Sequence, residues 1–270
     1  MEMNRVGSQK PIGVFDSGVG GLSVAREIFR KLPNEQIIYF GDTAHVPYGP
    51  RSQSELIHFG NQITDFLINQ GVKMIIIACN TSSSLSFESL KEKYNLPFVD
   101  VINPSIDVAI KNSTKQKIGV IATEATIKTG AHKKLLLAEN PNVEVFTSAC
   151  PKFVPLVEQG TVEGKEVEKI IYEYLAPLME KEIDTLILGC THYPFLEKSI
   201  KKVLGKDIKI IDPAQETVVM AKTSLQRLNL LNLHPNKDNE YWVSGDPDSF
   251  YKNAQNFIQD NIKKVNQVTL

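Results

Sequence analysis

The sequence lacks any long apolar run, which sets the first limit on the classes of protein to which it can belong. No stretch approaches the roughly 20 consecutive apolar residues that a membrane-spanning helix needs. The residues before the first predicted strand, 1–11, are polar and contain no apolar signal core. We therefore expect a cytoplasmic protein that contacts no membrane.

The chain also lacks an excess of either charge. Lys and Arg together number 30 against 31 for Asp and Glu, and no long run of one sign occurs. Proteins that bind nucleic acid usually carry a basic patch or stripe. We therefore expect no nucleic-acid partner. With 270 residues and 42% hydrophobic residues, the chain is long enough for two modest domains with their own cores.

Cysteine is scarce, and its placement is informative. The three cysteines, Cys79, Cys150 and Cys190, are odd in number and form no Cys-x-x-Cys motif, so neither a disulfide framework nor a thiol-redox motif is predicted. Cys79 and the Cys190-Thr-His192 segment also lack the usual spacing of zinc ligands. We expect free thiols and no metal. Cys150 lies outside the other motifs and is predicted to be a small buried residue.

Predicted strands alternate regularly with segments whose apolar residues recur at helical spacing. Ser52 and Glu55 have the spacing of a capping box at the start of one such helix. Lys73–Ala78 is a continuous apolar run, as expected for a strand covered on both faces. The predicted strands are Ile12–Phe15, Gln36–Phe40, Lys73–Ala78, Phe98–Ile102, Lys117–Ala122, Val143–Thr147, Thr185–Gly189, Ile208–Ile211 and Tyr241–Ser244. This pattern predicts an α/β fold with mostly parallel sheets.

The two halves of the chain echo each other. Ile-Gly-Val occurs in a predicted strand at Ile12 and again at Ile118, 106 residues later. Cys79 and Cys190 each follow an apolar run and lie 111 residues apart. Such similar offsets favour an internal duplication, although short apolar strands also resemble one another by chance. We predict two similar open sheets, with one thiol at the carboxyl edge of each, where open α/β sheets bind ligands.

A glycine-rich turn follows the first predicted strand and reads Asp16-Ser17-Gly18-Val19-Gly20-Gly21. Its glycines allow backbone to approach an anion closely. The turn lacks the Gly-Lys-Ser/Thr ending of a phosphate loop and is not a full dinucleotide fingerprint. Nucleotide binding is therefore not favoured.

Four stretches together carry a family resemblance. They are Asp16–Gly21, Gly41-Asp-Thr-Ala with Pro47-Tyr48-Gly49, Ala78-Cys79-Asn80-Thr81, and Gly189-Cys190-Thr191-His192-Tyr193-Pro194. With these motifs the chain resembles the glutamate racemases of the aspartate/glutamate racemase superfamily from about residue 11 to residue 215. His45 departs from the family, in which Arg is more frequent at this position. His192 favours the glutamate enzymes, because aspartate racemases tend to carry Glu after Cys-Thr.

The resemblance implies a bacterial, cofactor-independent isomerase that supplies D-glutamate for peptidoglycan and often forms a homodimer. It implies that Cys79 acts on D-glutamate with help from Asp16, and that Cys190 acts on L-glutamate with help from His192. Glu158 is placed near the second thiol. The implied lobes are residues 1–103 with 214–270, carrying Asp16 and Cys79, and residues 104–213, carrying Cys190 and His192.

The chemistry can also be argued from the residue types. Inversion at an α-carbon is simplest with two bases on opposite faces, one removing the proton and the other returning it. A free thiol, with a pKa of about 8.5, needs tuning for this task and would titrate as a coupled pair with its partner. Small polar turns would bind the carboxylates and ammonium of glutamate. The predicted substrate-binding residues are Asp16, Ser17, Pro47, Tyr48, Gly49, Asn80, Thr81, Thr123, Thr126, Thr191 and His192.

Simpler interpretations remain for the assisting residues. An Asp in a glycine-rich turn often only accepts hydrogen bonds from backbone amides. His192 could cap a helix, and Glu158 could be an exposed helical residue before the terminating Gly160. Two other functions also stay open: a racemase acting on aspartate or another acidic amino acid, and a two-lobed amino-acid-binding protein without catalysis.

Overall fold

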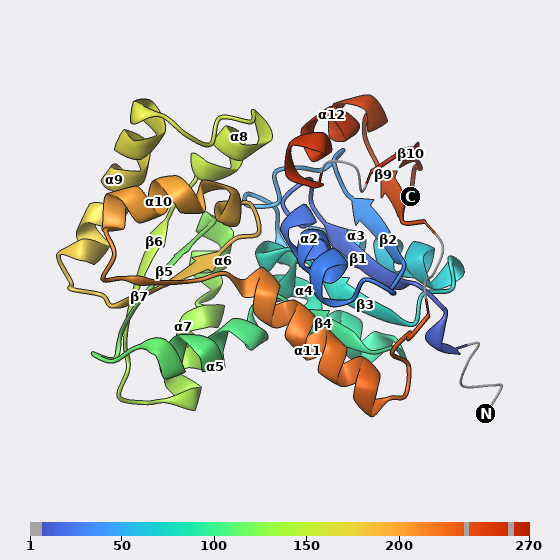
Figure 1. The fold of residues 1–270 in the computed structure, drawn as a ribbon, viewed down its shortest axis with the longest axis horizontal. Coiled ribbons are helices and arrows are strands. Elements are labelled where there is room, and N and C mark those ends of the chain that lie inside the picture. Colours follow the sequence, from blue (N-terminus) through green and yellow to red (C-terminus); the bar gives the residue numbers. More distant parts are fainter. Residues whose placement is uncertain (1–6, 235–237, 259–261) are drawn as a thin grey trace.

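A computed structural model describes residues 7–234, 238–258 and 262–270, and it contains two parallel sheets flanked by helices (Figure 1). The polar N-terminal stretch for which we predicted no signal peptide lies mostly outside these described residues. Within them, no helix is long and apolar enough to cross a membrane. All strand pairs described in the two sheets are parallel, so the predicted α/β class is confirmed.

The first sheet has the order β10-β9-β2-β1-β3-β4. Its strands are β1 (Ile12–Asp16), β2 (Ile37–Gly41), β3 (Met74–Ile77), β4 (Phe98–Asp100), β9 (Glu240–Val243) and β10 (Asn266–Gln267). The helices connected to it are α2 (Leu22–Lys31), α3 (Gln53–Asn69), α4 (Asn80–Lys93), α11 (Pro213–Arg227) and α12 (Pro247–Ile258). The predicted capping box is present at the start of α3, where Ser52 and Glu55 bond each other's backbone N–H groups.

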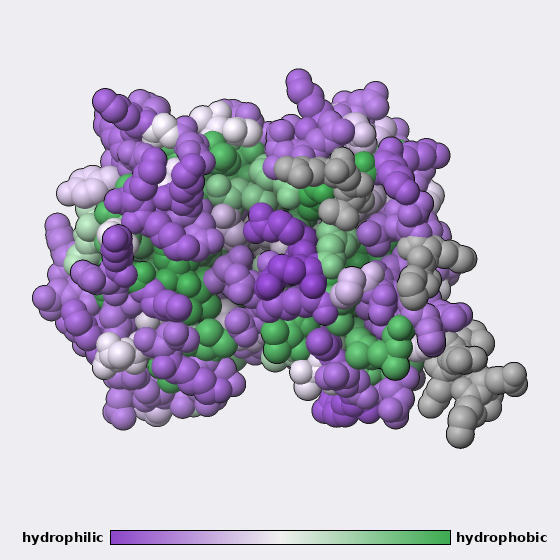
Figure 2. Space-filling view, in the orientation of Figure 1, coloured by the Kyte–Doolittle hydropathy of each residue, from purple (hydrophilic) through white to green (hydrophobic). Residues whose placement is uncertain are grey.

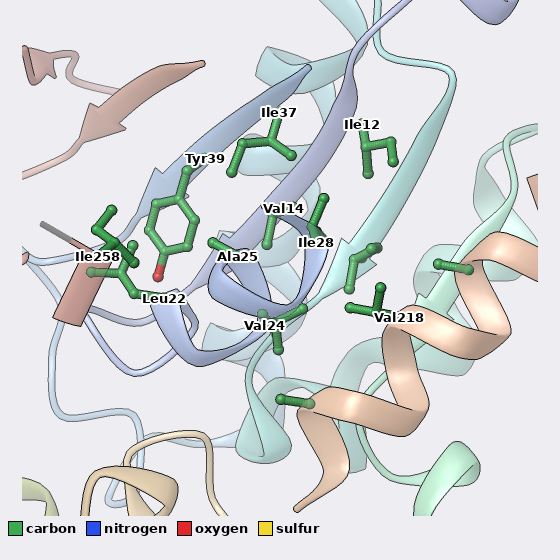
Figure 3. Close-up of a cluster of buried hydrophobic side chains, with 14 of the residues drawn as sticks. Ile12, Val14, Leu22, Val24, Ala25, Ile28, Ile37, Tyr39, Val218 and Ile258 are labelled. Atoms are coloured by element: carbon green, nitrogen blue, oxygen red, sulfur yellow. The ribbon is translucent and has the colours of Figure 1, made fainter. Parts of the chain in front are cut away.

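The core of the first lobe lies between this sheet and the helices α2, α11 and α12. Figure 3 shows Val14 and Tyr39 of the sheet facing Ala25 and Ile28 of α2, with Val218 of α11 beside them. These side chains are all at most 1% exposed. Burial on both faces explains why β1, β2 and β3 read as continuous apolar runs.

The second sheet has the order β6-β5-β7-β8. Its strands are β5 (Lys117–Ala122), β6 (Glu144–Ala149), β7 (Thr185–Gly189) and β8 (Lys209–Ile211). Its helices are α5 (Asn103–Asn112), α6 (Glu124–Thr129), α7 (Ala131–Glu139), α8 (Phe153–Glu158), α9 (Lys165–Met179), the short 3₁₀ helix η1 (Tyr193–Leu196) and α10 (Glu197–Leu204). Among the described strands, β6 is at the edge, which explains its partly exposed side chains.

The two sheets repeat one another in order and in register. The order β2-β1-β3-β4 of the first sheet recurs as β6-β5-β7-β8. Ile12 of β1 pairs with Met74, and its counterpart Ile118 of β5 pairs with Thr185. The predicted pair of similar lobes is therefore confirmed, while their boundaries at residues 103 and 213 stay a prediction.

The chain passes between the lobes at two places that lie close together. It leaves the first sheet after β4 and enters α5, and it returns after β8 through α11. Figure 1 shows α5 and α11 side by side, and the two helices are in contact. Figure 2 shows this face of the molecule as mostly hydrophilic, with apolar side chains in separate groups instead of one continuous patch.

Candidate active site

The topology leaves an opening at the carboxyl end of each central strand. In the sheet, β1 lies between β2 and β3. The chain passes from β1 to β2 on one side and from β3 to β4 on the other, so the connections that follow β1 and β3 lead in opposite directions. Asp16 ends β1 and Cys79 follows β3, so both reach this switch point. Thr123 and Cys190 occupy the corresponding positions after β5 and β7. Ligands of open α/β sheets bind at such points.

One cavity joins the two openings. Its volume is about 250 Å³, smaller than the roughly 300–1,000 Å³ of sites that take drug-sized ligands. The residues that line it are Asp16, Ser17, Val46, Pro47, Tyr48, Gly49, Pro50, Cys79, Asn80, Thr81, Thr123, Glu124, Cys150, Pro151, Val154, Pro155, Cys190, Thr191 and His192. The cavity therefore contains both predicted thiols and most of the predicted substrate-binding residues. Thr126 and Glu158 lie just outside it.

Cys79 is the N-cap residue of α4 and is only 5% exposed. Burial raises the pKa of its thiol well above the ordinary value, and the charges of Asp16 and Cys190 raise it further, while hydrogen bonds from Ser82 oppose the shift. Cys79 is therefore a neutral thiol at neutral pH. Cys190 lines the same cavity as Cys79, so the two thiols lie in one site.

Asp16 lies fully buried between the glycine-rich turn and the cavity. Its Oδ2 accepts the backbone N–H groups of Gly21 at 2.8 Å and Gly18 at 3.2 Å. Burial raises the pKa of this carboxyl group, against the lowering effects of His192 and the two amides. The other oxygen, Oδ1, has no hydrogen-bond partner. Hydrogen bonds from backbone amides, the simpler interpretation of Asp16, thus account for Oδ2 only. They leave Oδ1 for a ligand or a thiol.

His192 connects Cys190 to Glu158. Its Nδ1 lies 3.7 Å from the Cys190 sulfur, and its Nε2 lies 2.8 Å from Glu158 Oε1. Burial by itself would lower the pKa of His192, but the hydrogen bonds and negative charges of Cys190 and Glu158 outweigh it, so the pKa lies well above the ordinary value. His192 makes no side-chain cap of η1. Glu158 ends α8 with 26% of its side chain exposed, yet its carboxylate faces His192.

The glycines of the first turn make room for side chains of the second lobe. A Cβ atom at Gly20 would lie 2.2 Å from His192 Nδ1, and one at Gly18 would lie 2.8 Å from Glu158 Oε1. The approach of an anion to these glycines stays a prediction. In the structure they make room for His192 and Glu158, and Gly20 in particular allows the close approach of the two lobes.

Several buried polar groups at the cavity have no hydrogen-bond partner among the described residues. Both side-chain atoms of Asn80 and the hydroxyl of Thr191 are unpaired. Because buried polar groups are normally hydrogen-bonded, they are ready to bind the polar groups of a ligand. The Thr81 hydroxyl bonds across the lobes to Thr123 at 3.1 Å, and Thr126 completes this hydroxyl cluster from behind.

The loop that carries Tyr48 is fixed by Asp42. The carboxylate of Asp42 accepts hydrogen bonds from the Tyr48 hydroxyl, from Ser244 at 2.7 Å and from His45 Nδ1 at 2.9 Å. Tyr48 is held against Cys79 in one apolar cluster. His45, at the position where the family more often has Arg, also stacks on Phe59 with ring centroids 4.1 Å apart.

The apolar wall of the cavity was not among the features predicted from the sequence. Cys150 is buried as predicted, but with Pro151, Val154 and Pro155 it also lines the cavity. These residues follow Ala149, the carboxyl end of β6. Ligands of open α/β sheets bind at the carboxyl ends of the strands, and this principle located the residues after β1, β3, β5 and β7. Applied to β6 as well, it would have predicted these wall residues. In the part of the chain that is described, no group of three or more His, Cys, Asp or Glu residues could hold a metal ion.

We predict that Glu158→Gln lowers the pKa of His192, because it removes a carboxylate that raises this pKa. A histidine whose folded pKa lies above its unfolded value of about 6.5 stabilises the protein below that pH, and the contribution disappears as pH rises through the folded pKa. The variant should therefore lose most stability in acid, with the difference shrinking as the pH rises. NMR titration of the ring and urea unfolding at several pH values measure both effects.

The matched control is Glu163→Gln, which removes a surface ion pair with Lys198 and should leave the His192 titration unchanged. An unaltered His192 titration in Glu158→Gln would show that this carboxylate does not tune the histidine.

Comparisons with known proteins agree with this geometry. The family model for Asp/Glu/Hydantoin racemase matches residues 12–221. A glutamate racemase from Trichormus variabilis is 45% identical over 248 residues, which cover 92% of this chain and 84% of that protein.

Two crystal structures show the same fold over nearly the whole chain. A glutamate racemase isoform from Bacillus anthracis has a TM-score of 0.92 at 38% identity, covering 97% of this chain and 98% of that one. A glutamate racemase from Francisella tularensis in complex with D-glutamate has a TM-score of 0.90 at 39% identity, with the same coverage.

Proposed function

Because this chain belongs to the Asp/Glu/Hydantoin racemase family, we propose that it is a glutamate racemase, an isomerase that interconverts L- and D-glutamate without a cofactor. One observation carries the proposal: two thiols from equivalent strands of two similar lobes line a single small cavity. Each thiol has its own ionisable neighbour, Asp16 for Cys79 and His192 for Cys190. The related proteins named as glutamate racemases, one of them bound to D-glutamate, support the choice of substrate.

Each direction of the reaction starts from one protonation state of the two thiols. Burial favours the neutral thiol at Cys79, and the raised pKa of His192 favours an imidazolium next to Cys190. With L-glutamate bound, Cys190 removes the α-proton and becomes a thiol. The Cys79 thiol then gives its proton to the opposite face of the α-carbon, which yields D-glutamate and leaves Cys79 as the thiolate. The reverse reaction needs the opposite charge states.

The site must also stabilise the negative charge that develops on the substrate as the proton leaves. Cys79 is the N-cap residue of α4, and the first residues of that helix, Asn80 and Thr81, line the cavity, so the helix N-terminus lies at the cavity. The unpaired side chains of Asn80 and Thr191 add polar groups at fixed positions. Donors arranged in advance in a buried site stabilise such charge most effectively.

After each turnover the two thiols have exchanged their protonation states and must be reset. Asp16, with its free Oδ1, and His192 are the buried groups placed to move protons to and from Cys79 and Cys190. We propose Glu158 as the residue that keeps His192 charged and oriented. Their roles are those of general acid and base partners to the thiols.

The cellular role is proposed on the same basis. The named relatives are glutamate racemases of bacteria, and we propose that this enzyme supplies D-glutamate for peptidoglycan synthesis in the cytoplasm and acts as a homodimer. Rescue of a D-glutamate-requiring bacterial strain by the expressed chain tests the first part. Sedimentation velocity tests the second, and a monomer at working concentration would contradict it.

The direct test of the reaction is L-glutamate in D₂O, followed by circular dichroism and mass spectrometry with no cofactor added. We expect the signal to fall to zero from either enantiomer. Because enantiomers have equal free energies in water, kcat/KM must be equal in the two directions. With two bases, newly formed D-glutamate carries solvent deuterium, while the remaining L-glutamate keeps its α-hydrogen early in the reaction.

A product that keeps the original α-hydrogen would point to a single base and contradict the two-thiol mechanism. If the circular dichroism signal stayed constant with glutamate and decayed with aspartate, the protein would be an aspartate racemase instead. A flat trace with both, together with glutamate binding by calorimetry, would identify a binding protein.

A further inference from the structure

The two lobes meet at a second place, away from the chain crossings. The crossings lie at α5 and α11, which are in contact with each other. Figure 1 shows α12 of the first lobe at the other end of the interface, next to the part of the second lobe that contains α8. The cavity is lined by residues of both lobes between these ends. A contact at the α12 end can therefore set how far the lobes close.

This contact is a pair of phenylalanine rings. Phe257 of α12 and Phe195 of η1 have ring centroids 3.9 Å apart with an interplanar angle of 33°. The Arg26 guanidinium of α2 lies 5.7 Å from the centroid of the Phe195 ring. Phe257 packs against the hydrophobic cores of both lobes. Phe195 belongs to the core of the second lobe alone.

Phe195 is tied directly to the catalytic turn. Its backbone N–H bonds the His192 carbonyl at 3.2 Å, and the Tyr193 N–H bonds the Cys190 carbonyl at 3.0 Å. Cys190, His192 and Phe195 therefore lie on one short, hydrogen-bonded turn. The backbone that carries the Phe195 ring is therefore the same turn that positions the histidine and the thiol.

On the first lobe, the contact is tied to the glycine-rich turn. Helix α12 packs on α2, which begins directly after Gly21. Its Phe250 ring lies against Gly41 and 5.9 Å from Tyr39, whose hydroxyl bonds the Gly18 carbonyl at 2.7 Å. Both ends of the phenylalanine pair thus connect to parts of the site that must meet closely, the glycine turn and His192.

We infer that Phe257 is a positioning residue: with Phe195 it forms an aromatic latch that holds the lobes at the approach in which Cys190 and His192 face Cys79 and Asp16. The inference rests on the proposed racemase function. Phe257 does not line the cavity and acts through Phe195.

The test is a double-mutant cycle with Phe195→Leu, Phe257→Leu and both together, measured as glutamate racemisation in both directions. Aromatic pairs are worth about 0.5–1.5 kcal/mol beyond their burial, so each single variant should lose about 2- to 10-fold in kcat/KM. If the rings act as one latch, the double variant loses little more than either single variant. Phe257→Tyr keeps the stacked ring and should restore most of the activity.

Phe66→Leu is the matched control, because the Phe66 ring makes an edge contact with Trp242 and a tilted contact with Phe40 within the first lobe. It should lower the melting temperature about as much as Phe257→Leu and leave kcat/KM unchanged. Small-angle X-ray scattering of the ligand-free protein should show a larger radius of gyration for Phe257→Leu than for Phe66→Leu.

The outcomes separate the latch from the function on which it rests. Wild-type protein without racemase activity would overturn the proposed function. Active wild-type protein with additive effects of the two latch variants, or with unchanged kinetics in Phe257→Leu, would overturn the latch and leave the function standing.

Discussion

Cys79→Ser and Cys190→Ser should each lower kcat for glutamate racemisation by about 10²- to 10⁴-fold, the usual contribution of a positioned acid or base. The hydroxyl of serine is far less acidic than a thiol, so it neither becomes the base nor donates a proton as readily. Both sulfurs are buried, at 5% and 6% exposure, and serine is nearly the same size. The fold should therefore survive, as a melting curve will show.

The two variants should differ in which enantiomer still exchanges its α-hydrogen. With Cys190 intact, Cys79→Ser can still remove and return the α-proton on one face, so deuterium from D₂O should enter L-glutamate. Cys190→Ser should exchange D-glutamate instead. Cys150→Ser makes the same substitution in the apolar wall of the cavity, where the sulfur donates to the Ser148 carbonyl, and it should cost far less turnover than either catalytic variant. Near-normal turnover in either catalytic variant, or exchange of both enantiomers in each, would rule out one thiol per face.

The fold was largely predictable because parallel strands that are buried on both faces appear in the sequence as continuous apolar runs. Met74–Ile77 and Thr185–Gly189 read as apolar runs since helices cover both faces of their sheets. The repeated Ile-Gly-Val at Ile12 and Ile118 correctly marked the central strand of each sheet. The edge strand β6 was less distinct, because its exposed face relaxes the demand for apolar residues.

The candidate site was predictable wherever a residue directly follows a strand. Asp16, Cys79, Thr123 and Cys190 are all placed by the same rule about carboxyl edges. The partnership of Glu158 with His192 could be expected only by resemblance, since the two lie 34 residues apart in the chain and meet through tertiary packing. The Phe195–Phe257 contact left no sequence signal, because an aromatic residue that bridges two lobes resembles any core residue.

Gly20→Ala should lower racemisation about 100-fold, the loss that a displacement of about 1 Å at a catalytic group can cause. The added Cβ would lie 2.2 Å from His192 Nδ1 and 2.9 Å from the Thr191 hydroxyl. Gly20 is not among the glycines with positive φ, so alanine fits the backbone and the substitution tests space alone. His192 must move away from Cys190, and the crowding should also cost about 1–3 kcal/mol of stability.

The control for Gly20→Ala is Gly71→Ala, which strains the backbone without crowding a neighbouring side chain. Gly71 has a φ of +79° and nothing within 4 Å of the new Cβ, so alanine there is strained but meets no neighbour. It should lower the melting temperature and leave racemisation intact. A second check is His192→Asn with and without Gly20→Ala: since the shorter side chain leaves the Cβ more room, Gly20→Ala should cost much less in that background. If Gly20→Ala kept full activity with His192 in place, the close approach of the glycine turn to the histidine would have no part in catalysis.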